Sequence, residues 1–99
     1  MADIDKHFTI VFDAHKVVLQ NKFHVESIAI FGSVLRGTAG PDSDVDILVR
    51  YQKIPGLFAF LDLKQYLETI MGRSVDLVTE GALKKQLREE IMQEAVRVV

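Results

Sequence analysis

The chain of 99 residues contains no cysteine, so it can form neither a disulfide bond nor a thiolate metal site, and it has no cysteine nucleophile. No apolar stretch reaches the length of about 18 residues that a membrane-spanning helix needs. The first five residues include two aspartates and no basic residue, which is not the pattern of a secretory signal. A cytoplasmic location is therefore the default expectation.

The chain also lacks an excess of positive charge, since its net charge at neutral pH is −2. A general nucleic-acid-binding protein normally carries a basic patch, so that class is not expected. Lys84, Lys85 and Arg88 do form a small basic cluster, but a solvated helix flank explains it better than a phosphate or partner contact. With 48% hydrophobic residues and no repeat, low-complexity tract or linker, we expect one domain over residues 1–99.

The most informative pattern is a Gly-Ser step, ten intervening residues, and an Asp-x-Asp pair. Gly32 and Ser33 follow an apolar run that ends at Phe31, and Asp44 and Asp46 open a second apolar run. A turn explains either motif by itself. Together they put polar groups at the ends of two predicted strands, which is where a sheet exposes chemistry.

The Asp-x-Asp pair indicates a metal site. Residues i and i+2 of a strand point to one face and lie about 6.5–7 Å apart, so Asp44 and Asp46 present two carboxylates side by side while Val45, Ile47 and Val49 face the other way. Two like charges repel unless a cation neutralises them. Carboxylate oxygens suit Mg²⁺ or Mn²⁺, which add waters and substrate phosphate oxygens to one or two protein ligands.

The Gly-Ser step indicates a phosphate site beside the carboxylates. Gly32 has no Cβ, so a phosphate can approach the backbone closely. A short helix starting at Ser33 would add N–H donors and the serine hydroxyl. Arg36 lies one turn further on and could reach the same triphosphate.

A third carboxylate, Asp76, interrupts a short apolar strand within residues 73–79. With Val75 and Leu77 on the core face, Asp76 must point to the opposite one. A charge on an edge strand that discourages aggregation is the alternative explanation. Beside Asp44 and Asp46, a third metal ligand becomes the better interpretation.

The remaining pattern predicts an α/β (α+β) fold with a small mixed sheet of about three strands flanked by helices. The order is helix, strand, short helix, strand, helix, strand, helix. Helices on the Val45 and Val75 face would leave the aspartates on an open face. We expect helices at Ile4 to Asn21, at Leu57 to Met71 with Gly72 as the C-cap, and after Thr79 as N-cap, strands at Ser27–Phe31, Val45 to Arg50 or Tyr51, and within 73–79, and a loop at 38–42.

The last helix carries an apolar stripe of Leu83, Leu87, Ile91 and Ala95, which we interpret as core packing. Val98 and Val99 end an apolar tail that could join a partner interface or pack on its own domain. His7, His15 and His24 show no relation as metal ligands and are expected at the surface or its boundary. Nothing in the sequence decides between a monomer and a homo-oligomer.

The set Gly32-Ser33, Asp44-x-Asp46 and Asp76 resembles the nucleotidyltransferase superfamily that includes DNA polymerase beta. It is most similar to the minimal nucleotidyltransferases of prokaryotes, which stand alone at about 100 residues. The resemblance implies a nucleotidyltransferase fold and transfer of a nucleoside monophosphate from an NTP, with release of pyrophosphate. It makes Asp44, Asp46 and Asp76 catalytic ligands of two Mg²⁺ ions, and Gly32, Ser33 and Arg36 triphosphate contacts.

Many members of the minimal family resemble the antitoxin of a two-gene module whose partner is a HEPN-domain ribonuclease. The resemblance therefore implies adenylylation of a tyrosine on that toxin, with ATP as donor. The chain is too short to hold an acceptor domain of its own, so the acceptor is expected on another molecule. Two alternatives stay open: a non-catalytic module that neutralises its partner by occupancy, and transfer to a small molecule or an RNA end.

Overall fold

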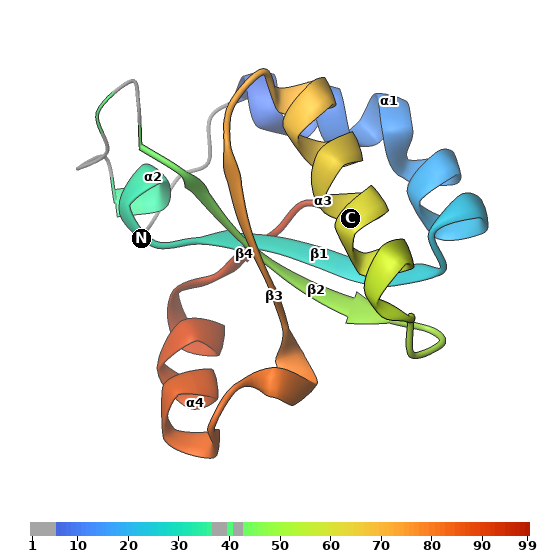
Figure 1. The fold of residues 1–99 in the computed structure, drawn as a ribbon. Helices are drawn as coiled ribbons and strands as arrows, with labels where there is room; N and C mark the ends of the chain where they lie inside the picture. Colours follow the sequence, from blue (N-terminus) through green and yellow to red (C-terminus); the bar gives the residue numbers. More distant parts are fainter. Residues whose placement is uncertain (1–5, 37–39, 41–42) are drawn as a thin grey trace.

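The computed structural model of the chain describes residues 6–36, 40 and 43–99, and Figure 1 shows their arrangement. Helices alternate with strands, as the sequence predicts. The elements are α1 (Lys6–Lys22), β1 (Val25–Phe31), α2 (Ser33–Arg36), β2 (Val45–Tyr51), α3 (Leu57–Met71), β3 (Val75–Thr79), a 3₁₀ turn η1 (Glu80–Ala82), α4 (Lys85–Glu94) and β4 (Val96–Arg97).

The described strands form one mixed sheet in the order β3-β2-β1-β4. β1 pairs antiparallel with β2 and with β4, whereas β2 and β3 run parallel. Parallel neighbours need a crossover, and α3 supplies it. The prediction of about three strands was one short, because β4 consists of two residues in an apolar tail that gives no alternating pattern.

The C-terminal tail packs on its own domain. The amide groups of Val98 and Val99 both donate hydrogen bonds to the carbonyl oxygen of Ile28, at 2.8 and 3.2 Å. Val99 is buried. Of the two roles left open for this tail, the described structure therefore supports burial against β1.

The hydrophobic core lies between one face of the sheet and the helices α1 and α3 (Figure 1). Strand alternation decides which residues face it, and Val45, Ile47 and Val49 are all fully buried as predicted. The opposite face carries the aspartates and is crossed by α4. The core residues contributed by the two helices include Phe8, Phe12, Leu19, Leu63, Leu67 and Met71.

The predicted helix boundaries agree best with the structure where the sequence contains a residue that ends a helix. α3 begins at Leu57 and ends at Met71, as predicted, and Gly72 closes it with φ of 66°. Its amide donates to the carbonyl oxygen of Glu68 at 2.9 Å, which is the left-handed cap that glycine favours. α1 is described from Lys6; the predicted start at Ile4 lies outside the described residues, as do positions 38, 39, 41 and 42 of the predicted loop.

The last helix differs from its prediction. Thr79 precedes the turn η1 instead of capping α4, and its side chain makes no capping hydrogen bond. α4 starts only at Lys85, and none of its ten residues is fully buried. Leu87 is 47% exposed. The stripe that we interpreted as core is therefore a half-exposed face over the aspartate side of the sheet.

Within the described ranges, the three histidines behave as predicted. His7 and His24 are exposed. His15 is half-buried between α1 and α3, where its Nδ1 lies 2.6 Å from the hydroxyl of Tyr66. No helix in the described part of the chain has the length and apolar character required to cross a bilayer.

The packing predicts different effects for two leucines on α3. Leu63 is fully buried and Leu57 is 69% exposed. We expect Leu63→Ala to lower the free energy of unfolding by about 2–5 kcal/mol, because it leaves a cavity. Leu57→Ala should change it by less than about 0.5 kcal/mol. Urea unfolding followed by circular dichroism measures both, and similar losses would contradict the described packing of α3.

Candidate active site

Three strand ends place Gly32, Asp46 and Asp76 in one row across the sheet. Phe31, the last residue of β1, is the register partner of Asp46, and Asp46 is in turn the partner of Asp76. Partners on neighbouring strands share a face and lie about 5 Å apart. The glycine and two of the three aspartates predicted from the sequence therefore lie together at one end of the strands.

Gly32 makes the closest approach in this row. Its φ is 81°, a left-handed backbone conformation that favours glycine. A Cβ built on Gly32 would fall directly on the carboxylate of Asp46. Only a residue without a side chain can bring its backbone so close to the carboxylate of Asp46.

Asp44 lies immediately before β2, exposed to solvent. The backbone around it is fixed from two sides. The Val45 amide donates to the Ser74 carbonyl at 2.9 Å, and Nη2 of Arg73 donates to the Ser43 carbonyl at 2.7 Å. The start of β2 is thus held against the start of β3, so that Asp44 adjoins the row.

Ser33 is the first residue of the four-residue helix α2 and is half-buried directly after Gly32. Its position agrees with a phosphate contact. Arg36 closes α2, but its side chain lies outside the described part of the structure. The predicted contact from Arg36 to a triphosphate therefore stays a prediction.

The row opens into a pocket of about 420 Å³ between the sheet and α4. We call it the carboxylate pocket, because four carboxylates line it and none of its described lining residues is cationic. Carboxylates gathered in one pocket attract a cation to it. The lining residues are Phe31, Gly32, Asp46, Asp76, Val78, Leu83, Leu87, Glu90, Ile91 and Glu94.

Glu94, at the end of α4, is a site residue that the sequence analysis missed. Its Oε1 accepts a hydrogen bond of 2.8 Å from the backbone amide of Gly32. That amide is the group expected to meet a phosphate oxygen. A signal was present, since Glu90 and Glu94 are spaced i, i+4, a like-charge pair that weakens an isolated helix, but the apolar stripe beside them dominated the interpretation.

The carboxylates fit a divalent metal that arrives with a nucleotide. Across the described ranges, no three acidic or histidine side chains converge closely enough to enclose an ion by themselves. Mg²⁺ usually takes only one or two protein carboxylates and completes its shell with water and phosphate oxygens. The hard oxygen donors of Asp46 and Asp76 beside the open backbone at Gly32 match that pattern.

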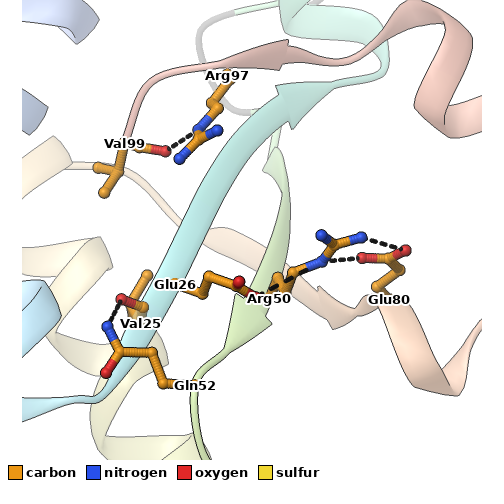
Figure 2. A network of polar contacts seen from close by, with 7 residues as sticks. All are labelled: Val25, Glu26, Arg50, Gln52, Glu80, Arg97 and Val99. Carbon is orange, nitrogen blue, oxygen red and sulfur yellow. Dashed lines mark hydrogen bonds and ion pairs between the residues drawn. The ribbon is translucent and has the colours of Figure 1, made fainter.

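A larger cavity of about 630 Å³ lies at the other ends of β2 and β3, near Tyr51 and Arg88. There Arg50 binds Glu80 through two hydrogen bonds, of 2.6 and 2.8 Å (Figure 2). This pairing, chiefly its hydrogen bond, lowers the pKa of Glu80, while burial raises the pKa of Tyr51 to about 12. Among its described lining residues this cavity offers a single carboxylate, which Arg50 binds, so it is a poorer metal site than the carboxylate pocket with its four.

Comparison with known proteins agrees with this geometry. Residues 13–98 match the model of the nucleotidyltransferase domain family. The chain belongs to the nucleotidyltransferase domain family. The protein adenylyltransferase MntA of Thermococcus cleftensis is 44% identical to this nucleotidyltransferase over 88 residues, 89% of each chain.

Solved structures share the fold. A structure described as a minimal nucleotidyltransferase is 32% identical, with a TM-score of 0.76 over 97% of this chain and 98% of the other. A complex of a tri-AMPylated HEPN toxin with an MNT antitoxin from Shewanella oneidensis gives a TM-score of 0.65 at 20% identity, over 92% of this chain and 71% of that one. The fold and the enzyme family predicted from the sequence are confirmed.

The contact between Glu94 and Gly32 predicts that this nucleotidyltransferase binds nucleotide against an internal competitor. Glu94→Gln replaces a charge-assisted hydrogen bond by a neutral one, which is weaker by about 1 kcal/mol. We therefore expect Mg²⁺ and AMP-PNP to bind the variant about fivefold more tightly in isothermal titration calorimetry.

Glu89→Gln is the matched control, because Glu89 is exposed on the same helix and does not line the carboxylate pocket. Its affinity for AMP-PNP should equal that of the wild type. Weaker binding by Glu94→Gln alone would contradict a competing role and would show that Glu94 holds Gly32 in its binding conformation.

Proposed function

We propose that this chain is a protein adenylyltransferase that transfers AMP from ATP to a tyrosine hydroxyl of a HEPN-domain partner. The observation that carries the proposal is the row of Gly32, Asp46 and Asp76 at the mouth of the carboxylate pocket. A backbone donor for phosphate thus lies beside a metal-type carboxylate pair. Metal-binding carboxylates are the groups that a metal-dependent transfer of a nucleotide uses.

The choice of ATP and of a protein acceptor rests on relatives. The 44% identical MntA of Thermococcus cleftensis is a protein adenylyltransferase, and the HEPN toxin in the Shewanella oneidensis complex carries AMP groups. This chain covers 89% of the length of the first. Similar length and high identity support the same donor and the same class of acceptor.

The residues of the row and its neighbours bind different parts of the metal-nucleotide complex. Asp44, Asp46 and Asp76 would hold two Mg²⁺ ions, which when bound neutralise the phosphate charge and stabilise the attacking and leaving oxygens. The Gly32 amide and Ser33 hold the β- and γ-phosphates, with Arg36 as a further cation. Glu94 releases the Gly32 amide when the triphosphate arrives.

The transfer itself is a single displacement at the α-phosphorus. The phenol oxygen of the acceptor forms a bond to the α-phosphorus, and the bond from that phosphorus to the oxygen bridging the β-phosphate breaks. Pyrophosphate leaves with the electron pair. The carboxylate of Asp76, on the acceptor side of the row, accepts the phenol proton and passes it to water.

Labelled transfer tests this proposal. The chain is incubated with Mg²⁺, α-³²P-labelled ATP and the protein product of the neighbouring gene, which we expect to be a HEPN-domain protein. We expect label on the partner with the wild type and a loss of at least about 100-fold with Asp46→Asn or Asp76→Asn, because each change removes charge stabilisation at the reacting phosphate.

Asp13→Asn is the control, since Asp13 is an exposed carboxylate on α1. It should label the partner like the wild type. Full neutralisation of the toxin by Asp46→Asn without any label would overturn the proposal in favour of binding alone. Label on RNA or on a small molecule, and none on the partner, would replace the acceptor.

A further inference from the structure

The row across the sheet has a direction. Gly32 follows β1, Asp46 lies on the central strand β2, and Asp76 lies on β3, which is an outer strand of the sheet. Attacking and leaving oxygens in a phosphoryl transfer lie on opposite sides of the phosphorus. If the leaving pyrophosphate lies at Gly32, the acceptor must enter over the β3 edge, past Asp76.

The carboxylate pocket also has apolar lining residues, on β3 and on the segment that follows it. Val78 follows Asp76 by two residues on the same face of β3, and Leu83, after η1, and Leu87, on α4, line the pocket with it. We call Val78, Leu83 and Leu87 the acceptor slot. These three apolar residues line the same pocket as Asp76 and Glu90.

The helix α4 joins the two halves of the pocket. Its N-terminal part follows β3 in the chain. At its C-terminal end, Glu94 accepts a hydrogen bond from the amide of Gly32, the residue directly after β1. α4 lies on the side of the sheet opposite α1 and α3 (Figure 1) and connects the segment after β3 with the end of β1. Leu87, which is half-exposed, lies in the first turn of α4, the end of the helix that follows β3 in the chain.

We infer that the acceptor slot binds the side chain of the acceptor residue and selects a phenol. This inference rests on the proposed adenylyl transfer. A tyrosine side chain has an apolar ring and one polar end, so the ring contacts Val78, Leu83 and Leu87 while the hydroxyl lies at Asp76. A serine or threonine hydroxyl that reached Asp76 would leave these apolar walls in water.

The charge of the pocket agrees with this occupant. Asp46, Asp76, Glu90 and Glu94 make it strongly acidic, and a phenol enters such a site as a neutral group. An acidic acceptor side chain would be repelled there. The exposure of Leu87, at 47%, is what a contact surface completed by another molecule requires.

Small acceptor amides test the slot without any turnover. The probes are N-acetyl-L-tyrosinamide, N-acetyl-L-phenylalaninamide and N-acetyl-L-serinamide, added to the chain with Mg²⁺ and AMP-PNP. Methyl signals of Leu83 and Leu87 are followed by NMR. We expect the tyrosine amide to shift both signals, the phenylalanine amide to shift them more weakly, and the serine amide to leave them unchanged.

Two variants on α4 form a matched pair. Leu87 and Met92 are equally exposed, at 47%, but only Leu87 lines the carboxylate pocket. Leu87→Asn should weaken binding of the tyrosine amide at least about tenfold, in the range that lost apolar contacts produce. Met92→Asn should stay within about twofold of the wild type, and AMP-PNP affinity should be unchanged in both.

Several results would overturn the inference. These are unchanged Leu83 and Leu87 signals with the tyrosine amide, equal effects of the two variants, or shifts by the amide that appear only when AMP-PNP is left out, which would assign the slot to the adenine ring. With the partner protein as acceptor, Leu87→Asn should raise KM and leave kcat nearly unchanged. Absence of label with the wild type would refute adenylyl transfer, whereas the amide titration decides the slot separately.

Discussion

The pairing register of β1, β2 and β3 is the constraint on which the site depends. It places Phe31 opposite Asp46 and Asp46 opposite Asp76. Gly32, the residue after Phe31, therefore lies beside the two aspartates. A shift of one residue in either pairing would turn an aspartate toward the core. The buried row of Val45, Ile47 and Val49 prevents such a shift, because it would expose their side chains. Core packing on one face thus fixes the chemistry on the other.

The same arrangement concentrates negative charge under α4. Four carboxylates share one pocket, and Glu94 satisfies the Gly32 amide at 2.8 Å. A nucleotide with its metal ions would exchange this internal anion for phosphate and neutralise the carboxylates together. α4 is suited to that exchange, because none of its residues is fully buried and its position costs little apolar burial to change.

The sequence predicted what local patterns determine. Both ends of α3 were correct because Gly56 and Gly72 mark them, and Asp46 and Asp76 were placed on the open face by the two-residue period of strands. The two-residue strand β4 and the contact from Glu94 to Gly32, 62 residues away, were missed. Those features arise from tertiary contacts between distant segments, which no window of sequence contains. We interpreted the stripe of Leu83, Leu87, Ile91 and Ala95 as core because the helical period alone does not distinguish a buried face from a half-exposed one.

The proposed activity requires the metal-nucleotide complex to bind at the row of Gly32, Asp46 and Asp76. Mn²⁺ with AMP-PNP, added in small amounts to the ¹⁵N-labelled chain, broadens the amide signals nearest to it. We predict the strongest broadening at Gly32, Asp46 and Asp76, and the weakest along β2 at Tyr51, about 16 Å from Asp46 at the other end of the strand. Strongest broadening at Tyr51 and Arg88, in the larger cavity of about 630 Å³, would contradict it.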